Sequence, residues 1–265
     1  MIIDSHEHVL IPTEKQIEKL DEAGVDKAIL FSTTSHIETC NTLNEVQQEM
    51  NRLNSVLGSN NATQKRVNDI LNSTKELCKV LENHKDRFLG FGNIPLSLSQ
   101  EETSSWIQDN IIKNNLKGIG EISPATPASA KALEKIFISL LDHKNLPIWI
   151  HTFNPVSIKE IKIIMSLCNK YSNVPVIFGH MGGSNWLDII NFAKNNENIY
   201  LDLSAAFTTL SIKFAINTLP NKCLFSSDAP YGEPKLNIQM IKKLSESNTI
   251  SNMVLGENII NLLDL

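Results

Sequence analysis

The sequence predicts an α/β protein of the (β/α)8 TIM-barrel type, and three observations support this prediction. The chain has 265 residues, close to the length of about 250 that is typical of such barrels. Eight short β-rich runs recur, and most are continuously apolar, as in parallel strands covered by helices. The segments between them have the apolar spacing of amphipathic helices. The expected strands are Ile2–Ser5, Asp26–Ser32, Phe88–Ile94, Leu116–Ile122, Pro147–His151, Val174–His180, Asn198–Leu203 and Lys222–Asp228.

The first expected helix covers Thr13–Ala23. Thr13 followed by Gln16 three residues later is the pattern of a capping box, and Gly24 is expected to end the helix. Apolar residues at helical spacing predict further helices over residues 129–143, 156–171 and 184–195. A doubly wound open sheet is the alternative architecture, but no glycine-rich phosphate loop follows the first strand, which counts against its nucleotide-binding form.

We interpret residues 1–265 as a single domain that carries a helical insertion, residues 36–85, after the second strand. The insertion has two helical patterns, over 43–57 and 63–83, which are separated by Gly58–Asn61. It is expected on the carboxyl-terminal face of the barrel, where active sites lie. It either caps the site or provides an extra pair of packing or dimerising helices.

The composition excludes several classes of protein. A net charge of −5 provides no basic field for nucleic acid or for an anionic membrane. No signal peptide and no membrane-spanning run of about 18 apolar residues is expected. The scattered cysteines form no C-x-x-C pair, so we expect reduced thiols and a cytoplasmic protein. The arginines all lie in one segment, so a multi-arginine clamp on a substrate is not expected unless that segment folds over the site; they are Arg52, Arg66 and Arg87.

A His-x-His sequence, His6 and His8, follows the first apolar run. In a strand, residues i and i+2 point to the same face, so both imidazoles are directed toward one point from a rigid backbone. That arrangement suits a divalent cation. Partly buried histidines also serve as ordinary polar residues, so the pair needs support from other ligands.

Four later strands end in further residues that can bind a metal, namely Glu121, His151, His180 and Asp228. The carboxyl ends of barrel strands meet at one mouth. Four histidines and two carboxylates suffice for two cations that share a bridging carboxylate and a bridging hydroxide. Imidazole ligands suit zinc, and also iron, cobalt or nickel.

Together these motifs resemble the amidohydrolase superfamily, and most closely its amidohydrolase-related group of metal-dependent hydrolases. The segments that carry the resemblance are Asp4-x-His6-x-His8, Gly120-Glu121, the strand ending at His151, Phe178–Gly183, Phe225–Pro230 and the closing Leu255–Leu263. The resemblance implies that His6, His8 and Asp228 hold the more buried ion, that His151 and His180 hold the second ion, and that Glu121 bridges the two. Many members bridge with a carbamylated lysine instead, and Glu121 resembles the TatD-like branch at this point.

The predicted function is therefore hydrolysis of a C–N or C–O bond in a small amide, cyclic amide, lactone or ester by a metal-bound hydroxide, most simply with two Zn²⁺ ions. Asp228 is expected to accept the proton of the attacking water. The alternatives are a metal-dependent decarboxylase of an aromatic or unsaturated acid, a TatD-like nuclease and an inactive scaffold. The expected partner is a small-molecule substrate, and a homo-oligomer is possible.

Three other polar residues lie near the expected site. Asp4 would point away from His6 and His8 in a regular strand, so it is expected in the core or behind the ligands. Asn93 and Ser204 end strands at the mouth, where they either contact the substrate or cap the strand ends.

Overall fold

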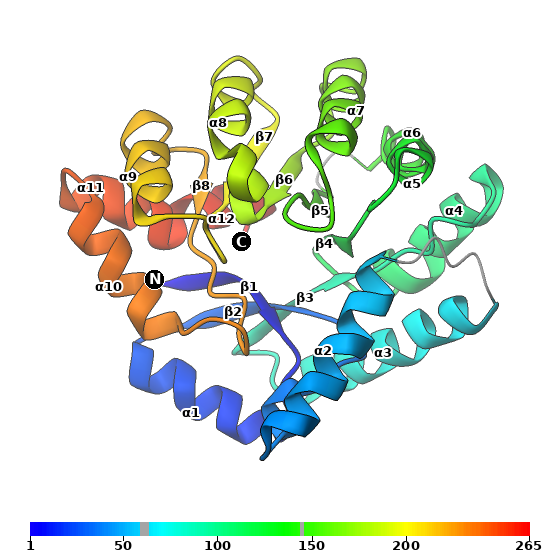
Figure 1. The fold of residues 1–265 in the computed structure, drawn as a ribbon, viewed down its shortest axis with the longest axis horizontal. Helices are drawn as coiled ribbons and strands as arrows, with labels where there is room; N and C mark the ends of the chain where they lie inside the picture. Colours follow the sequence, from blue (N-terminus) through cyan, green and yellow to red (C-terminus); the bar gives the residue numbers. More distant parts are fainter. Residues whose placement is uncertain (59–63, 144–145) are drawn as a thin grey trace.

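The computed structural model describes residues 1–58, 64–143 and 146–265. Within these ranges, eight parallel strands follow one another around a nearly closed barrel in the order β1 to β8, with helices on the outside (Figure 1). The fold is therefore the (β/α)8 barrel that the sequence predicts. The strands are β1 (Ile3–His8), β2 (Lys27–Phe31), β3 (Phe88–Gly92), β4 (Gly118–Ile122), β5 (Ile148–His151), β6 (Val176–Gly179), β7 (Ile199–Asp202) and β8 (Cys223–Leu224).

The barrel closes between β1 and the segment that follows β8. The Ser5 amide donates to the Phe225 carbonyl over 2.8 Å, and the Asp228 amide donates to the His6 carbonyl over 2.8 Å. The His8 amide donates to the Ala229 carbonyl over 2.9 Å. The predicted eighth strand reached Asp228, whereas β8 itself has two residues and the chain then continues beside β1 through these separate contacts. This closure carries Asp228 to the strand that bears His6 and His8.

Helices follow the strands as the apolar spacing predicts. The α-helices are α1 (Thr13–Ala23), α2 (Leu43–Gly58), α3 (Gln64–Asn83), α4 (Gln100–Trp106), α5 (Pro127–Ala132), α6 (Glu134–Ser139), α7 (Ile158–Lys170), α8 (Trp186–Lys194), α9 (Thr209–Thr218), α10 (Pro234–Leu244), α11 (Asn248–Asn252) and α12 (Asn258–Leu263). Short 3-10 or π turns cover Ile37–Thr39, Ile107–Ile112, His180–Asn185 and Met253–Glu257. The single helix expected over residues 129–143 is instead the pair α5 and α6.

Helix α1 has the predicted bounds but not the predicted cap. Its N-cap residue is Pro12, and no side chain caps it. Gln16 instead donates to the Glu7 carboxylate over 2.7 Å and to the His8 carbonyl over 2.9 Å. The capping-box interpretation was therefore wrong, because a buried acid in β1 binds the Gln16 side chain. Gly24 ends the helix as predicted, with a left-handed φ of 73°.

The two helical patterns between β2 and β3 form α2 and α3. Ile70 and Leu77 of α3 are buried in the core, so α3 occupies the position of the barrel helix that follows β2. Helix α2 is the additional element, and it is drawn in front of α3 in Figure 1. Of the segment expected to separate the helices, residues 59–61 lie outside the described part of the chain.

The barrel interior is filled by large side chains rather than by a channel. Trp149, Phe31 and Phe91 are fully buried inside it. Gly179 gives Trp149 its space, because a Cβ atom there would lie 2.1 Å from the indole ring. The metal-competent residues lie above this packed layer, at the carboxyl ends of the strands.

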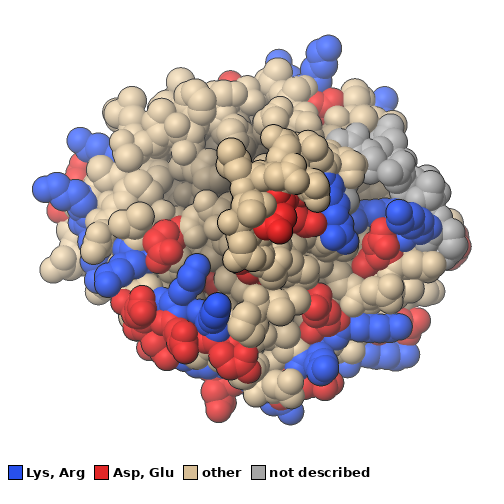
Figure 2. All heavy atoms as spheres, turned by 60° about the horizontal axis from the view of Figure 1, so that its bottom comes forward, with Lys and Arg blue, Asp and Glu red and all other residues tan. Residues whose placement is uncertain are grey.

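The surface carries charges of both signs. On the face shown in Figure 2, the lysines and arginines of the described residues are interspersed with aspartates and glutamates and form no continuous basic area. In the described part of the chain, no helix combines the length and the apolar character needed to cross a lipid bilayer.

Candidate metal centre

The structure brings the six predicted site residues together at the mouth of the barrel. Each is carried by the end of a strand or by the loop that follows, which fixes its position relative to the barrel. His6 and His180 are buried, and the remaining side chains keep only a small exposed fraction. The six are His6, His8, Glu121, His151, His180 and Asp228.

Four of the six side chains form the first part of the cluster. The Nε2 atoms of His6 and His8 both lie 3.6 Å from Glu121 Oε2. They lie 3.7 and 3.3 Å, respectively, from Asp228 Oδ1. Ligand atoms at about 2.0–2.2 Å from a tetrahedral cation are separated by about 3.3–3.6 Å, so the observed spacing fits such an ion.

The second part of the cluster surrounds the other oxygen of Glu121. His151 Nδ1 lies 2.6 Å from Glu121 Oε1, and His180 Nε2 lies 3.8 Å from it. The two imidazoles face each other, with His180 Nε2 3.2 Å from His151 Nδ1. Glu121 thus has one oxygen beside each pair of histidines.

The charges within the cluster compensate one another. Burial would raise the pKa of Glu121, but imidazole hydrogen bonds, from His151 and His180 above all, hold that pKa well below its usual value. Burial would lower the pKa of His6, but Asp228 and other nearby carboxylates raise it well above the usual value. The pKa of His180 is also raised, against its burial, by Glu121 and Asp228. The carboxylates and the imidazoles of the cluster therefore stabilise each other's charged forms.

The donor set fits divalent cations. His6 Nε2 is buried without a hydrogen-bond partner, although it faces two carboxylates. A buried polar atom without a partner is costly, and a metal ion would satisfy it. His6, His8 and Glu121 form one candidate ligand group, and Glu121, His151 and His180 form another.

The backbone has unusual conformations at three positions in or beside this cluster. His180, Met181 and Asp228 have φ values of 56°, 51° and 61°, in the left-handed region that residues with a Cβ rarely adopt. Such conformations persist where the surrounding structure imposes them, and they concentrate at functional sites. Here they direct the side chains of His180 and Asp228 toward the mouth.

Asp202, which the sequence analysis did not select, lies directly beneath the histidines. Its carboxylate accepts hydrogen bonds from Trp149 Nε1 over 3.1 Å and from the His180 amide over 3.1 Å. Asp202 Oδ2 lies 3.5 Å from His6 Nδ1, and Ser204 Oγ donates to Oδ1 over 2.5 Å. Because Asp202 holds the Nδ1 side of His6, it leaves Nε2 directed toward Glu121 and Asp228. The signal for Asp202 in the sequence was that it is the single acidic residue of β7.

Replacing Asp202 with asparagine is expected to weaken metal binding by about 10- to 100-fold, the usual cost of losing a partner that orients a metal-binding histidine. The asparagine amide carries no charge to orient His6. Its NH2 group would also face the N–H and O–H groups that now donate hydrogen bonds to the carboxylate. Chelator competition on folded protein measures the affinity, with Asp86→Asn on the surface as control. Unchanged affinity in a folded Asp202→Asn protein would show that Asp202 does not position the ligands.

Two further acids are buried behind the ligands. Asp4 accepts hydrogen bonds from the amides of His6 and Ser227, over 3.2 and 2.9 Å. Burial raises the pKa of Asp4 to about 7, although these hydrogen bonds oppose the rise. Glu7 is buried nearby and accepts the hydrogen bond from Gln16. Asp4 therefore joins β1 to the segment that carries Asp228, which agrees with its expected place in the core or behind the ligands.

Asn93 and Ser204, which were expected at the mouth, both contact the cluster. Asn93 Nδ2 donates to the Glu121 carbonyl over 2.7 Å, and Asn93 also lines the adjoining cavity. Ser204 Oγ lies 2.9 Å from His180 Nδ1. Both side chains therefore support residues of the cluster from the ends of β3 and β7.

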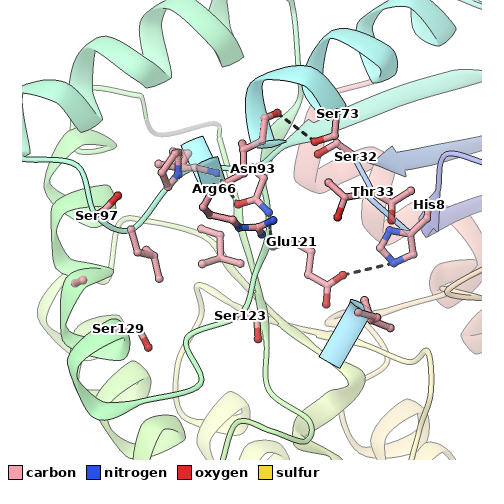
Figure 3. A pocket seen from close by; sticks show the side chains of 18 of the residues that line it. His8, Ser32, Thr33, Arg66, Ser73, Asn93, Ser97, Glu121, Ser123 and Ser129 are labelled. Carbon is pink, nitrogen blue, oxygen red and sulfur yellow. Dashed lines mark hydrogen bonds and ion pairs between the residues drawn. The ribbon is translucent and has the colours of Figure 1, made fainter. Parts of the chain in front are cut away.

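A cavity of about 380 Å³ opens beside the cluster. His8 and Glu121 lie in its wall, together with residues of α2 and α3 (Figure 3). Its other sides carry many hydroxyl groups and several apolar side chains. The segment between β2 and β3 therefore contributes directly to the space in front of the candidate ligands.

Comparison with known proteins gives one match to a protein family and several similar structures. The sequence matches a family model described as amidohydrolase over residues 3–265. No curated protein matches the sequence.

The similar solved structures are barrels that match along nearly their whole length. An uncharacterized TIM-barrel protein from Bordetella bronchiseptica has a TM-score of 0.73 at 16% identity, covering 99% of this chain and 98% of that one. A 2,6-dihydroxybenzoate decarboxylase from Rhizobium has a TM-score of 0.62 at 15% identity, and the match covers 99% of this chain and 98% of that one. A manganese-bound 5-carboxyvanillate decarboxylase from Novosphingobium aromaticivorans has a TM-score of 0.68 at 15% identity, and the match covers 100% of this chain and 96% of that one. At these identities the likeness shows the fold.

Proposed function

Because the chain belongs to the amidohydrolase family, we propose that it is a metal-dependent hydrolase that cleaves a C–N or C–O bond in a small molecule. One observation carries this proposal: the two oxygens of Glu121 face two different pairs of histidines. A carboxylate in that position suits two cations, and sites with two cations are well suited to hydrolysis.

In this proposal, His6, His8 and Asp228 would hold one ion, His151 and His180 would hold the other, and Glu121 would serve both. The nitrogen-rich donor set favours Zn²⁺, whereas two of the similar decarboxylases contain manganese. When bound, divalent cations make a water molecule more acidic and polarise a substrate carbonyl.

The residues of the chain have separate tasks in this scheme. Asp228 accepts a proton from the attacking water at Oδ2, because Oδ1 is the oxygen beside His6 and His8, and transfers it to the leaving group. Its side chain is 10% exposed, so it can meet the substrate at the mouth. Asp202 and Asn93 hold ligands in place from behind. The packed barrel interior below the cluster keeps bulk water away from the ligands on that side.

Decarboxylation of an aromatic or unsaturated acid is the second candidate. The comparisons favour it, because several of the similar structures are decarboxylases of aromatic acids, although another is named an amidohydrolase. This reaction would use one ion and would leave Glu121 without a bridging role. The geometry of Glu121 is the reason that we place hydrolysis first.

The other two alternatives have less support. A TatD-like nuclease would need a basic rim for the phosphate backbone, and charges of both signs are mixed on the face in Figure 2. An inactive scaffold would have no need to retain a ligand set with matched spacing and a cavity beside it.

Metal content together with product analysis separates the two leading functions. Protein purified without chelators is analysed for metal per chain, and it is then assayed with a panel of lactones, cyclic amides and hydroxybenzoates. The hydrolase is supported if the protein contains about two ions per chain and hydrolyses a lactone or a cyclic amide. One ion per chain and CO₂ release from a hydroxybenzoate establishes the decarboxylase instead.

A further inference from the structure

A second cavity, with a volume of about 220 Å³, opens among the segments that follow β7 and β8. Its wall includes Ile212 in the first turn of α9 and Met240 of α10, two helices that lie side by side (Figure 1). The larger cavity is lined by residues between β1 and α5, and no described residue lines both cavities. The mouth of the barrel therefore offers two separate spaces to a ligand.

The second cavity reaches the metal centre through two residues of the segment after β8. Asp228 lines this cavity, and its Oδ1 atom lies 3.3 Å from His8 Nε2. Tyr231 also lines it, and the Tyr231 and His8 rings meet edge to face with 5.9 Å between their centroids. His8 in turn lines the larger cavity, whereas Asp228 is not among the described residues of that wall. The cluster of candidate ligands thus separates the two cavities.

The wall of the second cavity favours a neutral group. Apolar side chains, among them Ala206 and Met240, face it from the segments around α9 and α10. Asn237 also lines it, but its amide already donates to the Ser226 carbonyl over 3.0 Å. Among the described residues of this wall, Asp228 is the single acidic residue and none is basic. Because the Asp228 carboxylate already lies beside the imidazoles, an ionised group in the cavity would lack a free partner of opposite charge.

We propose that this second cavity binds the leaving-group side of the substrate, and that the group bound there is neutral and about the size of a benzyl group. In the hydrolysis proposed above, water adds its OH to the carbonyl carbon, and the bond from that carbon to the leaving oxygen or nitrogen breaks. The leaving atom takes up the proton that Asp228 accepted from the water. It must therefore lie within hydrogen-bond reach of Asp228, about 3 Å away.

The position of Asp228 decides which cavity receives which half of the substrate. Since Asp228 lines the second cavity, the rest of the leaving group extends into it, and the acyl side faces the larger cavity beside His8 and Glu121. An apolar cavity of about 150 Å³ holds a benzene ring, so the observed volume of about 220 Å³ suits a benzyl group. This inference rests on the proposed function and adds the orientation of the substrate in the same site.

Binding of fragments tests the second cavity without turnover. Benzyl alcohol, benzylammonium and naphthylmethanol are titrated into metal-loaded protein and followed by NMR. Wild type is expected to bind benzyl alcohol more tightly than the charged or the larger probe. Ala206→Trp and Met240→Trp fill the cavity from two different segments, and each is expected to weaken benzyl alcohol binding by about tenfold or more. Leu236→Trp is the matched control, because Leu236 lies on α10, is 62% exposed and does not line the cavity.

Three results of this titration would overturn the inference. One is benzyl alcohol binding that is undiminished in both folded tryptophan variants. The second is no binding of benzyl alcohol to wild type at millimolar concentration. The third is tighter binding of benzylammonium than of benzyl alcohol.

Two isomeric lactones test the orientation of the substrate. γ-Phenyl-γ-butyrolactone carries its ring on the leaving-oxygen side, and α-phenyl-γ-butyrolactone carries it on the acyl side. Ala206→Trp is expected to lower the ratio of kcat/KM for the γ-phenyl isomer to that for the α-phenyl isomer by about tenfold or more. Ala128→Trp, which fills the larger cavity, should raise the same ratio.

The outcomes separate this inference from the proposed function. Hydrolysis of either isomer with an unchanged or opposite ratio overturns the orientation while the hydrolase proposal stands. If neither isomer is hydrolysed, the fragment titration alone decides whether the second cavity is a binding site. One ion per chain with CO₂ release removes the hydrolase and the leaving-group role together, whereas benzyl alcohol binding that is lost in Ala206→Trp still establishes the cavity as a site for a neutral group.

Discussion

Replacing Glu121 with glutamine is expected to reduce bound metal from about two ions per chain to about one and to lower turnover by roughly 10³-fold or more. The substitution keeps the size of the side chain and removes its charge. The amide also presents one oxygen instead of two, so it can face only one pair of histidines. The ion held by His151 and His180 loses its carboxylate ligand, and with it the charge that balances the cation.

Elemental analysis and steady-state kinetics on the same preparation measure both effects. Glu246→Gln, on the exposed surface, is the matched control and should behave as wild type. The histidines should remain in place in the folded variant, because strands β1 and β5 and the β6 loop hold them independently of Glu121. A Glu121→Gln protein with two ions and normal turnover would remove the bridging role and the main argument for hydrolysis.

Replacing Asp228 with asparagine is expected to separate metal binding from catalysis. His6, His8 and Glu121 still face the first ion, so most of the metal should remain. The amide cannot accept the proton of the attacking water, so kcat is expected to fall by about 10²–10⁴-fold.

Metal content and kcat of Asp228→Asn are compared with those of Asp188→Asn, an exposed position in α8. A purely structural role for Asp228 would lower stability and leave kcat per folded molecule unchanged. That pattern in a metal-replete variant would exclude Asp228 as the proton acceptor.

The sequence was sufficient for the fold and for bringing the six selected side chains to one mouth, although not for Asp202. Barrel strands end at one mouth, so residues at strand ends, such as His151 and His180, could be placed together without any knowledge of distances. The His-x-His spacing in the first strand predicted that His6 and His8 face one point, and both Nε2 atoms face Glu121 Oε2. These predictions succeeded because they depend on topology and not on detailed packing.

The features that the sequence could not provide depend on contacts between distant residues. Asp202 lies within an apolar strand, and only the packing of Trp149 and His180 against it reveals its position. Gln16 follows Thr13 at the spacing of a cap, but the buried Glu7 binds it instead. Arg66 could be recognised as a cavity residue only once α3 was placed beside the mouth.

The most direct test of the central claim is a crystal structure of the metal-loaded protein with anomalous scattering measured at the zinc and manganese edges. We predict two ions: one bound by His6, His8 and Asp228, the other by His151 and His180, with one Glu121 oxygen on each. A single ion with Glu121 unbound, or ions placed elsewhere, would contradict this prediction.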